Sequence, residues 1–176
     1  LIGFSQALIN QEAARIIIEP QQRREGFWFG GGNLVEGRDG NFYLVGRYRN
    51  AGDSRLGLAA GERGLELAIF RSTDRGERFT KILSFQKADL DVGERRVLSI
   101  EGAALHFTDS GVELFVSTEK SNIPYPAGLE AFLKEGTGVW TIEHLQADTL
   151  TGLSSAKIET ILECRDPRWL HVKDPF

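Results

Sequence analysis

The sequence predicts an all-β fold, a β-propeller built from four-stranded antiparallel blades. Two observations predict it: a unit of roughly 70 residues occurs twice, and each copy holds four stretches in which apolar and polar residues alternate. Four antiparallel strands in a repeat of this length are typical of a propeller blade. Five such periods would give a domain of roughly 350 residues, so five blades are expected, with six as the alternative.

The repeat is clearest where "GGGNLVEGRDGNFYLV" (residues 30–45) is set against "EGAALHFTDSGVELFV" (residues 101–116). An offset of 71 places Leu34 on Leu105. Each copy predicts a hairpin, because Asp and Gly between two alternating runs favour a tight turn. The two turns are expected at Asp39-Gly40 and at Asp109-Ser110-Gly111.

Two further strands follow each hairpin. In the first unit they are expected at 65–72 and 78–85, and in the second at 139–146 and 156–163. A helix is predicted only at 126–136, where Pro comes early and Gly late as start and stop signals.

The organisation that follows is one partial propeller domain over residues 1–176. Two blades and one strand cannot close a ring, and open sheet edges invite aggregation, so the remaining blades are expected on residues outside this sequence. Residues 14–21 are the candidate for a strand that closes the ring by pairing with the last blade. The expected parts are an N-terminal segment at 1–25, blade one at 26–86, blade two at 97–163 and the first strand of a third blade at 169–176.

Composition restricts the classes of partner. A net charge of −4 argues against nucleic acid and anionic membranes, and no apolar run approaches the roughly 20 residues of a membrane span. Cys164 is the single cysteine, so an internal disulfide is excluded and the compartment stays open. A soluble protein is expected, with a secreted or periplasmic location among the options. The three histidines share no metal-ligand spacing and no phosphate-binding glycine loop precedes a helix, so neither a metal nor another cofactor is expected.

"STDRGERF" (residues 72–79) has the pattern Ser-x-Asp-x-Gly-x-x-aromatic, which resembles the Asp box of sialidases and related propellers. In a tight hairpin, Asp74 would accept backbone hydrogen bonds, Gly76 would take a positive φ and Phe79 would pack beneath. That family places the motif between the third and fourth strands of a blade, far from the active site. Asp74 is therefore expected to be structural.

The first unit also resembles the first sialidase blade in its layout. By that match, Arg47 or Arg49 is the arginine that follows the second strand, and Asp53 is the acidic residue of the next loop. The arginine that opens the first strand of a sialidase is absent, because residues 30–32 are glycines.

The second unit resembles a different group, the five-bladed arabinanases, invertases and levansucrases. The resemblance rests on "IEGAAL", on "LFVSTEK" and on the closing "KDPF". In that group the Asp-Pro aspartate stabilises the transition state or tunes the pKa of the acid, a role that would fall to Asp174. The position of the group's first-blade acid falls within residues 30–33, which hold no carboxylate, and its later glutamate would lie beyond Phe176.

These resemblances imply a glycoside hydrolase that acts on a carbohydrate through carboxylates at the mouth of the propeller channel. Acids on neighbouring inner strands would converge there. The expected catalytic residues are Asp174 and Glu101. The expected substrate-binding residues are Arg47, Arg49, Asp53, Arg55, Trp28, His171 and Lys173.

Each of these residues also has a structural interpretation. Asp174 can simply begin a strand, and Glu101 can pair with Arg95 or Arg96. Arg47 and Arg49 can form a salt bridge at a sheet edge, the charges of the 50–57 loop can be merely solvated, and Trp28 can belong to the core between blades. Two alternative functions therefore stay open, a non-catalytic carbohydrate-binding or scaffold propeller and a sialidase-like exo-glycosidase.

Overall fold

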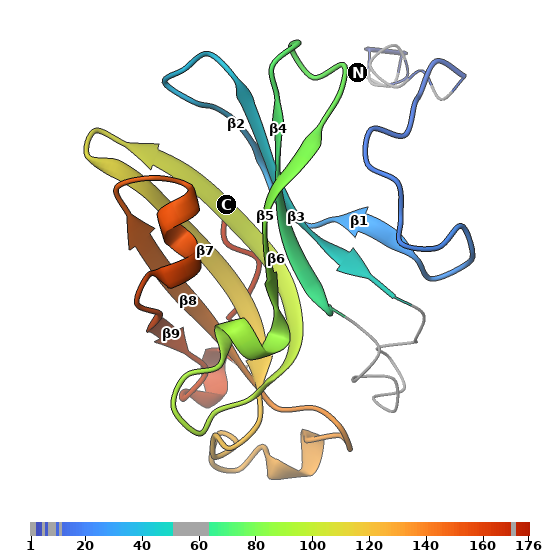
Figure 1. Cartoon of the computed structure of the whole chain (residues 1–176). Helices are drawn as coiled ribbons and strands as arrows, with labels where there is room; N and C mark the ends of the chain where they lie inside the picture. The colour runs from blue at the N-terminus through green and yellow to red at the C-terminus, as the bar shows by residue number, and fades with distance from the viewer. Residues whose placement is uncertain (1–2, 5, 7–9, 11, 51–63, 170–171) are drawn as a thin grey trace.

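The chain folds into two antiparallel β-sheets in a computed structural model, which describes residues 3–4, 6, 10, 12–50, 64–169 and 172–176. The two sheets lie side by side in Figure 1, and the C-terminal segment reaches the second sheet, where Asp174 accepts a hydrogen bond from Gly102. The all-β prediction is confirmed. Among the described residues, no helix has the length and apolar character that a membrane crossing needs.

The first sheet is formed by residues 28–86, with β1, β3, β4 and β5 in spatial order and β2 also paired with β3. β1 and β2 lie end to end along β3, because Gly30 pairs with Arg47 and Leu34 pairs with Leu44. The five strands are β1 (Trp28–Gly30), β2 (Leu34–Glu36), β3 (Phe42–Arg49), β4 (Glu66–Ser72) and β5 (Thr80–Gln86).

The second sheet is a simple meander in which each strand pairs with the next. Its strands are β6 (Val97–Thr108), β7 (Gly111–Lys120), β8 (Val139–Ala147) and β9 (Glu159–Glu163). The hairpins and the third and fourth strands predicted for both units are therefore present. Gly40 has a φ of 73°, as a tight turn between β2 and β3 requires.

The first strand of the first unit is broken into two short strands, β1 and β2. Gly31 has a φ of 74°, outside the range of an extended strand. A side chain at Gly32 would collide with the carbonyl group of Val45. Because Gly32 has no side chain, the backbone at the break between β1 and β2 can approach β3 more closely than it could with any residue other than glycine.

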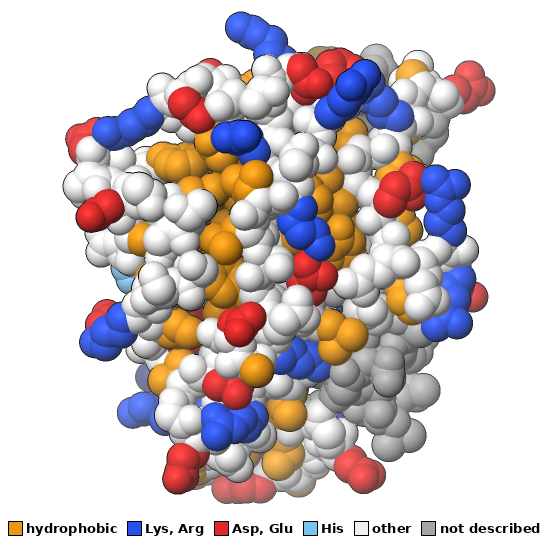
Figure 2. All heavy atoms as spheres, in the orientation of Figure 1, with side chains coloured by type: hydrophobic (Ala, Val, Ile, Leu, Met, Phe, Trp, Pro, Cys, Tyr) orange, Lys and Arg blue, Asp and Glu red, His pale blue; other side chains and the backbone are white. Residues whose placement is uncertain are grey.

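The core lies between the two sheets. Alternate residues of β7 face the first sheet, and β6 and β8 contribute their own inward positions to the same layer. The buried members include Val45, Leu67, Ile69, Phe85, Leu105, Val112, Leu114, Val116 and Leu145. Figure 2 shows hydrophobic side chains gathered near the middle of the visible face, with charged side chains of both signs around them.

Backbone contacts join the sheets at the spacing of the sequence repeat. The amide of Ala103 donates to the carbonyl oxygen of Gly31 at 2.9 Å. The side-chain amide of Asn33 donates to the Leu105 carbonyl at 3.0 Å and accepts from the Leu105 N–H at 2.8 Å, across 72 residues of sequence. Residues separated by about one repeat length are therefore in contact across the two sheets.

The helix predicted at 126–136 is wrong. The structure has a single turn of 3-10 helix, Glu130–Phe132, flanked by turns. Gly128 and Gly136 both have positive φ values, so the glycines bound a compact loop rather than a helix.

Residues 172–176 do not form the strand predicted for the start of a third blade. Asp174 has a φ of 59°, which is incompatible with an extended strand, and the described strands leave these residues unpaired. Residues 14–21 also carry no strand; there, Ile18 packs against Tyr48, Ala68 and Phe70. A strand requires a hydrogen-bonded neighbour, and neither segment has one among the described residues.

Candidate functional site

Four of the predicted site residues meet where the first sheet contacts β6. Arg47 comes from β3, Glu101 from β6, Trp28 from β1 and Asp174 from the C-terminal segment. Arg47 pairs in register with Gly30, so its side chain emerges beside the break between β1 and β2. The structure thus brings these four predicted residues close together.

Arg47 and Glu101 form a buried ion pair. Nη2 of Arg47 lies 2.7 Å from Oε2 of Glu101, and the two side chains are 9% and 7% exposed. The hydroxyl of Ser99 donates to the other carboxylate oxygen of Glu101 at 2.7 Å. The two partners considered for Glu101 from the sequence, Arg95 and Arg96, instead pair with Glu163 and Asp91.

The glycines of the 30–32 run explain how Arg47 fits. A Cβ at Gly31 would collide with Nη1 of Arg47, so the guanidinium occupies the volume that a side chain at Gly31 would need. The guanidinium also lies over the Trp28 ring, 5.0 Å from its centroid. The guanidinium of Arg47, which belongs to β3, thus fills the space beside the glycine run.

Burial lowers the pKa of the Arg47 guanidinium, and the negative charges of Glu101 and Asp174 oppose that shift. The positive charge of Arg49 adds to the lowering, so Arg49 also lies within electrostatic reach. An arginine nevertheless keeps its proton in proteins, so the site retains a fixed positive charge. Nε of Arg47 is buried and has no hydrogen-bond partner among the described residues.

Glu101 and Gly102 lie in a β-bulge. Ile100 pairs with Thr118 and Ala103 with Val116, so β6 has one residue more than β7 between these two pairs. A bulge redirects side chains and releases backbone groups from the ladder. The released N–H of Gly102 donates to Oδ1 of Asp174 at 3.2 Å.

Asp174 is the accessible carboxylate of the group. Its side chain is 58% exposed, and Oδ2 lies 4.0 Å from Nζ of Lys173. Lys173 in turn lies over the ring of Trp140, 4.9 Å from the ring centroid. Trp28 is 41% exposed, so an aromatic surface is open beside the charged groups.

Three predicted substrate-binding residues, Asp53, Arg55 and His171, lie outside the described residues. Within the part of the chain that the structure describes, no group of three or more His, Cys, Asp or Glu residues could hold a metal ion. The candidate site consists of the Arg47 cation, the carboxylates of Glu101 and Asp174, and the ring of Trp28. This arrangement suits a polar ligand with an apolar face.

The turn at 72–79 has the geometry expected from its sequence. The hydroxyl of Ser72 donates to Oδ1 of Asp74 at 2.8 Å, and the same oxygen accepts the N–H of Arg78 at 2.9 Å. Gly76 has a φ of 90°, and Phe79 packs against the smaller apolar cluster of the first sheet. These hydrogen bonds lower the pKa of Asp74. All of its contacts hold the turn, so Asp74 is structural here.

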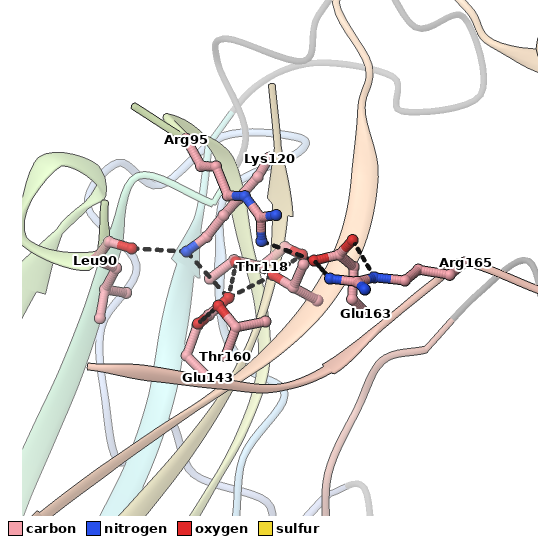
Figure 3. Close-up of polar contacts among 9 residues, drawn as sticks. Leu90, Arg95, Thr118, Lys120, Glu143, Thr160, Glu163 and Arg165 are labelled. Carbon is pink, nitrogen blue, oxygen red and sulfur yellow. Dashed lines mark hydrogen bonds and ion pairs between the residues drawn. The ribbon is translucent and has the colours of Figure 1, made fainter. Parts of the chain in front are cut away.

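Sequence reasoning missed a second polar cluster, shown in Figure 3. Lys120 of β7 and Glu143 of β8 pair at 3.0 Å, and both side chains are completely buried. Nζ of Lys120 also donates to the Leu90 carbonyl at 2.8 Å, and the hydroxyls of Thr141 and Thr160 donate to the Glu143 carboxylate at 2.5 and 2.7 Å. Lys120 and Glu143 lie on the same face of the sheet as Val116, whose side chain is part of the core. The alternation along the two strands could therefore have predicted that both charged side chains are buried.

Glu163 forms a neighbouring but separate node at the end of β9 (Figure 3). Its carboxylate accepts from Arg95 at 2.7 Å and from Nε of Arg165 at 2.7 Å. With each carboxylate in these two clusters matched to a cation, and Lys120 and Glu143 sealed from solvent, the clusters hold strands together and offer no open group for chemistry.

Comparison with known proteins found no matching family model, no matching curated protein and no matching solved structure. Function must therefore be argued from the site itself.

Proposed function

We propose that the chain is part of a β-propeller that hydrolyses glycosidic bonds, with the sugar bound at Arg47, Glu101, Asp174 and Trp28. One observation carries the proposal: residues from three strands and from the C-terminal segment, far apart in sequence, meet around a single exposed carboxylate. Such convergence of charged and aromatic groups at one place is the usual basis for proposing a binding site.

Two features support the propeller. Each sheet is an antiparallel meander of four strand positions, with β1 and β2 sharing the first, and the sheets pack face to face. The contact of Ala103 with Gly31 spans 72 residues, and the contact of Asp174 with Gly102 spans the same distance. The matched spacing supports the proposal that the C-terminal segment leads into a third blade.

The chemistry assigns different roles to the two carboxylates. The Glu101 carboxylate is buried and both of its oxygens are engaged, one by Arg47 and the other by Ser99, so a ligand cannot reach it and it is unsuited to the role of proton donor. The Asp174 side chain is accessible, so in this proposal it would stabilise the positive charge that develops at the anomeric carbon. Trp28 would stack on the sugar ring, and the proton donor would come from a further blade.

Binding of a carbohydrate without hydrolysis is the second candidate. It is favoured by the buried Arg47–Glu101 pair, because that pair neutralises a carboxylate that a catalytic pair would need. Residues 30–32 carry no acid that could replace it.

The test uses the full-length protein with aryl glycosides, including a sialoside, and plant and algal oligosaccharides. Asp174→Asn should lower turnover by at least about 100-fold. The matched control is Asp148→Asn, an exposed aspartate that follows β8 at the other end of the second sheet, and it should leave turnover unchanged.

Each result decides between the candidates. Full turnover in Asp174→Asn would remove Asp174 from the site. Sugar binding by calorimetry without any turnover would select the binding protein, and turnover restricted to the sialoside would select a sialidase-like enzyme. Neither turnover nor binding would overturn both candidates.

A further inference from the structure

Gly31 and Gly102 occupy equivalent positions of the two repeat units, 71 residues apart. Each has a charged site residue directly above it. The atoms that a Cβ at Gly31 would meet all belong to Arg47, and the three nearest atoms to a Cβ at Gly102 all belong to Asp174. At these two equivalent positions, the charged side chains therefore lie directly against backbone that carries no side chain.

We propose that Gly102 is the positioning residue for Asp174. This inference rests on the proposed function and deepens it, because it names what fixes the accessible carboxylate. A Cβ at Gly102 would lie 2.6 Å from Oδ1 of Asp174 and 2.9 Å from its Cα, well inside normal contact distances. Only glycine lets the aspartate lie directly against β6.

The bulge supplies the second half of the device. Because β6 has an extra residue at Glu101–Gly102, the Gly102 N–H is available to Asp174 rather than to β7. The bulge also lets neighbouring Glu101 turn toward Arg47. One local irregularity thus orients both carboxylates of the site.

Gly102→Ala is a clean probe of this arrangement. Gly102 does not have a φ in the left-handed region, so alanine suits its backbone, and the three atoms nearest to the added Cβ all belong to Asp174. Gly31→Ala would be less clean, because Gly31 has a φ of 74° and alanine would add backbone strain. The matched control is Gly152→Ala, where the nearest atoms lie 3.2 Å away on side chains remote from the site.

The experiment is a double-mutant cycle in the full-length protein. Gly102→Ala should lower kcat by about 10- to 100-fold, as expected for displacement of a catalytic group by about an ångström. Adding Gly102→Ala to Asp174→Asn should cost nothing further, because the two changes act through the same carboxylate. Additive losses, or an unchanged kcat in Gly102→Ala, would overturn the proposal. If the protein binds sugar without turnover, the dissociation constant replaces kcat.

A spectroscopic signal separates this inference from the proposed function. Lys173 lies over the Trp140 ring, so displacement of residues 173–174 should shift the indole N–H resonance of Trp140 in a ¹H–¹⁵N spectrum. Gly102→Ala should produce that shift and Gly152→Ala should not. If no sugar is bound or hydrolysed, the proposed function fails, and the Trp140 resonance alone decides: a shift supports positioning and an unchanged resonance refutes it.

If Gly102→Ala is too unstable for the activity assay, the double-mutant cycle is measured by melting temperature instead. Asp174→Gly then replaces Asp174→Asn as the second substitution. Removing the aspartate side chain takes away the nearest clashing atom, so the loss in melting temperature caused by Gly102→Ala should shrink. An equal loss in both backgrounds would show that the conflict lies elsewhere and would overturn the proposal.

Discussion

Lys120 and Glu143 form an ion pair that is completely closed to solvent, with 3.0 Å between Nζ and Oε1. Burial lowers the pKa of Lys120, and the charge of Glu143 opposes that shift. The pair connects β7 to β8, and the hydrogen bond from Lys120 to Leu90 connects both strands to the segment between the sheets. The removal of one partner would leave the other charge buried and unpaired, and this is what makes the loss of a buried pair strongly destabilising.

Lys120→Met should therefore destabilise the protein by about 3–5 kcal/mol, because Glu143 would be left buried without its counter-charge. The measurement is urea unfolding at neutral pH. The control is Lys157→Met, which removes the lysine of an exposed pair with Glu159 and should leave the unfolding free energy nearly unchanged.

The double variant Lys120→Met/Glu143→Leu distinguishes charge from packing. Replacing both partners by apolar groups removes the uncompensated charge, so the double variant should be more stable than Lys120→Met alone. A double variant that is less stable than the single one would show that the ion pair itself, rather than the orphaned carboxylate, dominates.

The sequence could predict those parts of the fold that depend on local chemistry. Alternation identified the strands, and the turn at Asp74 follows from the side-chain oxygens and the glycine that such a turn requires. The broken first strand was missed, because the clash of a Gly32 side chain with Val45 arises only once β3 is in place.

Tertiary partners explain the remaining differences. Alternation could place Lys120 and Glu143 on the buried face of their strands, but it could not predict that they pair, because the pairing depends on how β7 and β8 align. For the candidate site, the repeat and the resemblances pointed to Arg47, Glu101 and Asp174. The ion pair between the first two, and the bulge that orients the last two, depend on contacts between the sheets.

Asn33→Asp should weaken the junction between the sheets. The Asn33 amide both donates to and accepts from the backbone of Leu105, whereas a carboxylate would face the Leu105 carbonyl without a proton to donate. We expect a loss of about 1–3 kcal/mol in urea unfolding at pH 7. Asn122→Asp, at an exposed position, is the control, and equal losses in the two variants would contradict the argument.

Asp74→Ala should lower the melting temperature and leave sugar turnover or binding unchanged. The substitution removes the acceptor for Ser72 and for the Arg78 N–H but touches no residue of the proposed site. Differential scanning fluorimetry and the glycoside assay test the two halves separately. A loss of turnover in a protein that remains folded at the assay temperature would show that Asp74 has a role beyond its turn.

Glu163 should contribute stability that is lost in acid. The hydrogen bond from Arg165, together with Arg95, lowers the pKa of Glu163 below its ordinary value of 4.5. A carboxyl whose pKa is lower in the folded than in the unfolded state stabilises the fold fully above the unfolded value. That contribution disappears as the pH falls through the folded value.

Glu163→Gln should accordingly be less stable than the parent protein at pH 7, by about 1 kcal/mol given the exposure of Arg165. The difference in unfolding free energy should narrow once the pH drops below 4.5, where the unfolded chain takes up the proton first. Urea unfolding between pH 7 and pH values below that point measures it. Glu94→Gln, at an exposed turn, should show a small difference at every pH. A gap between Glu163→Gln and the parent that widened in acid would mean that folding raises rather than lowers the pKa of Glu163, and the two arginines would not be its stabilising partners.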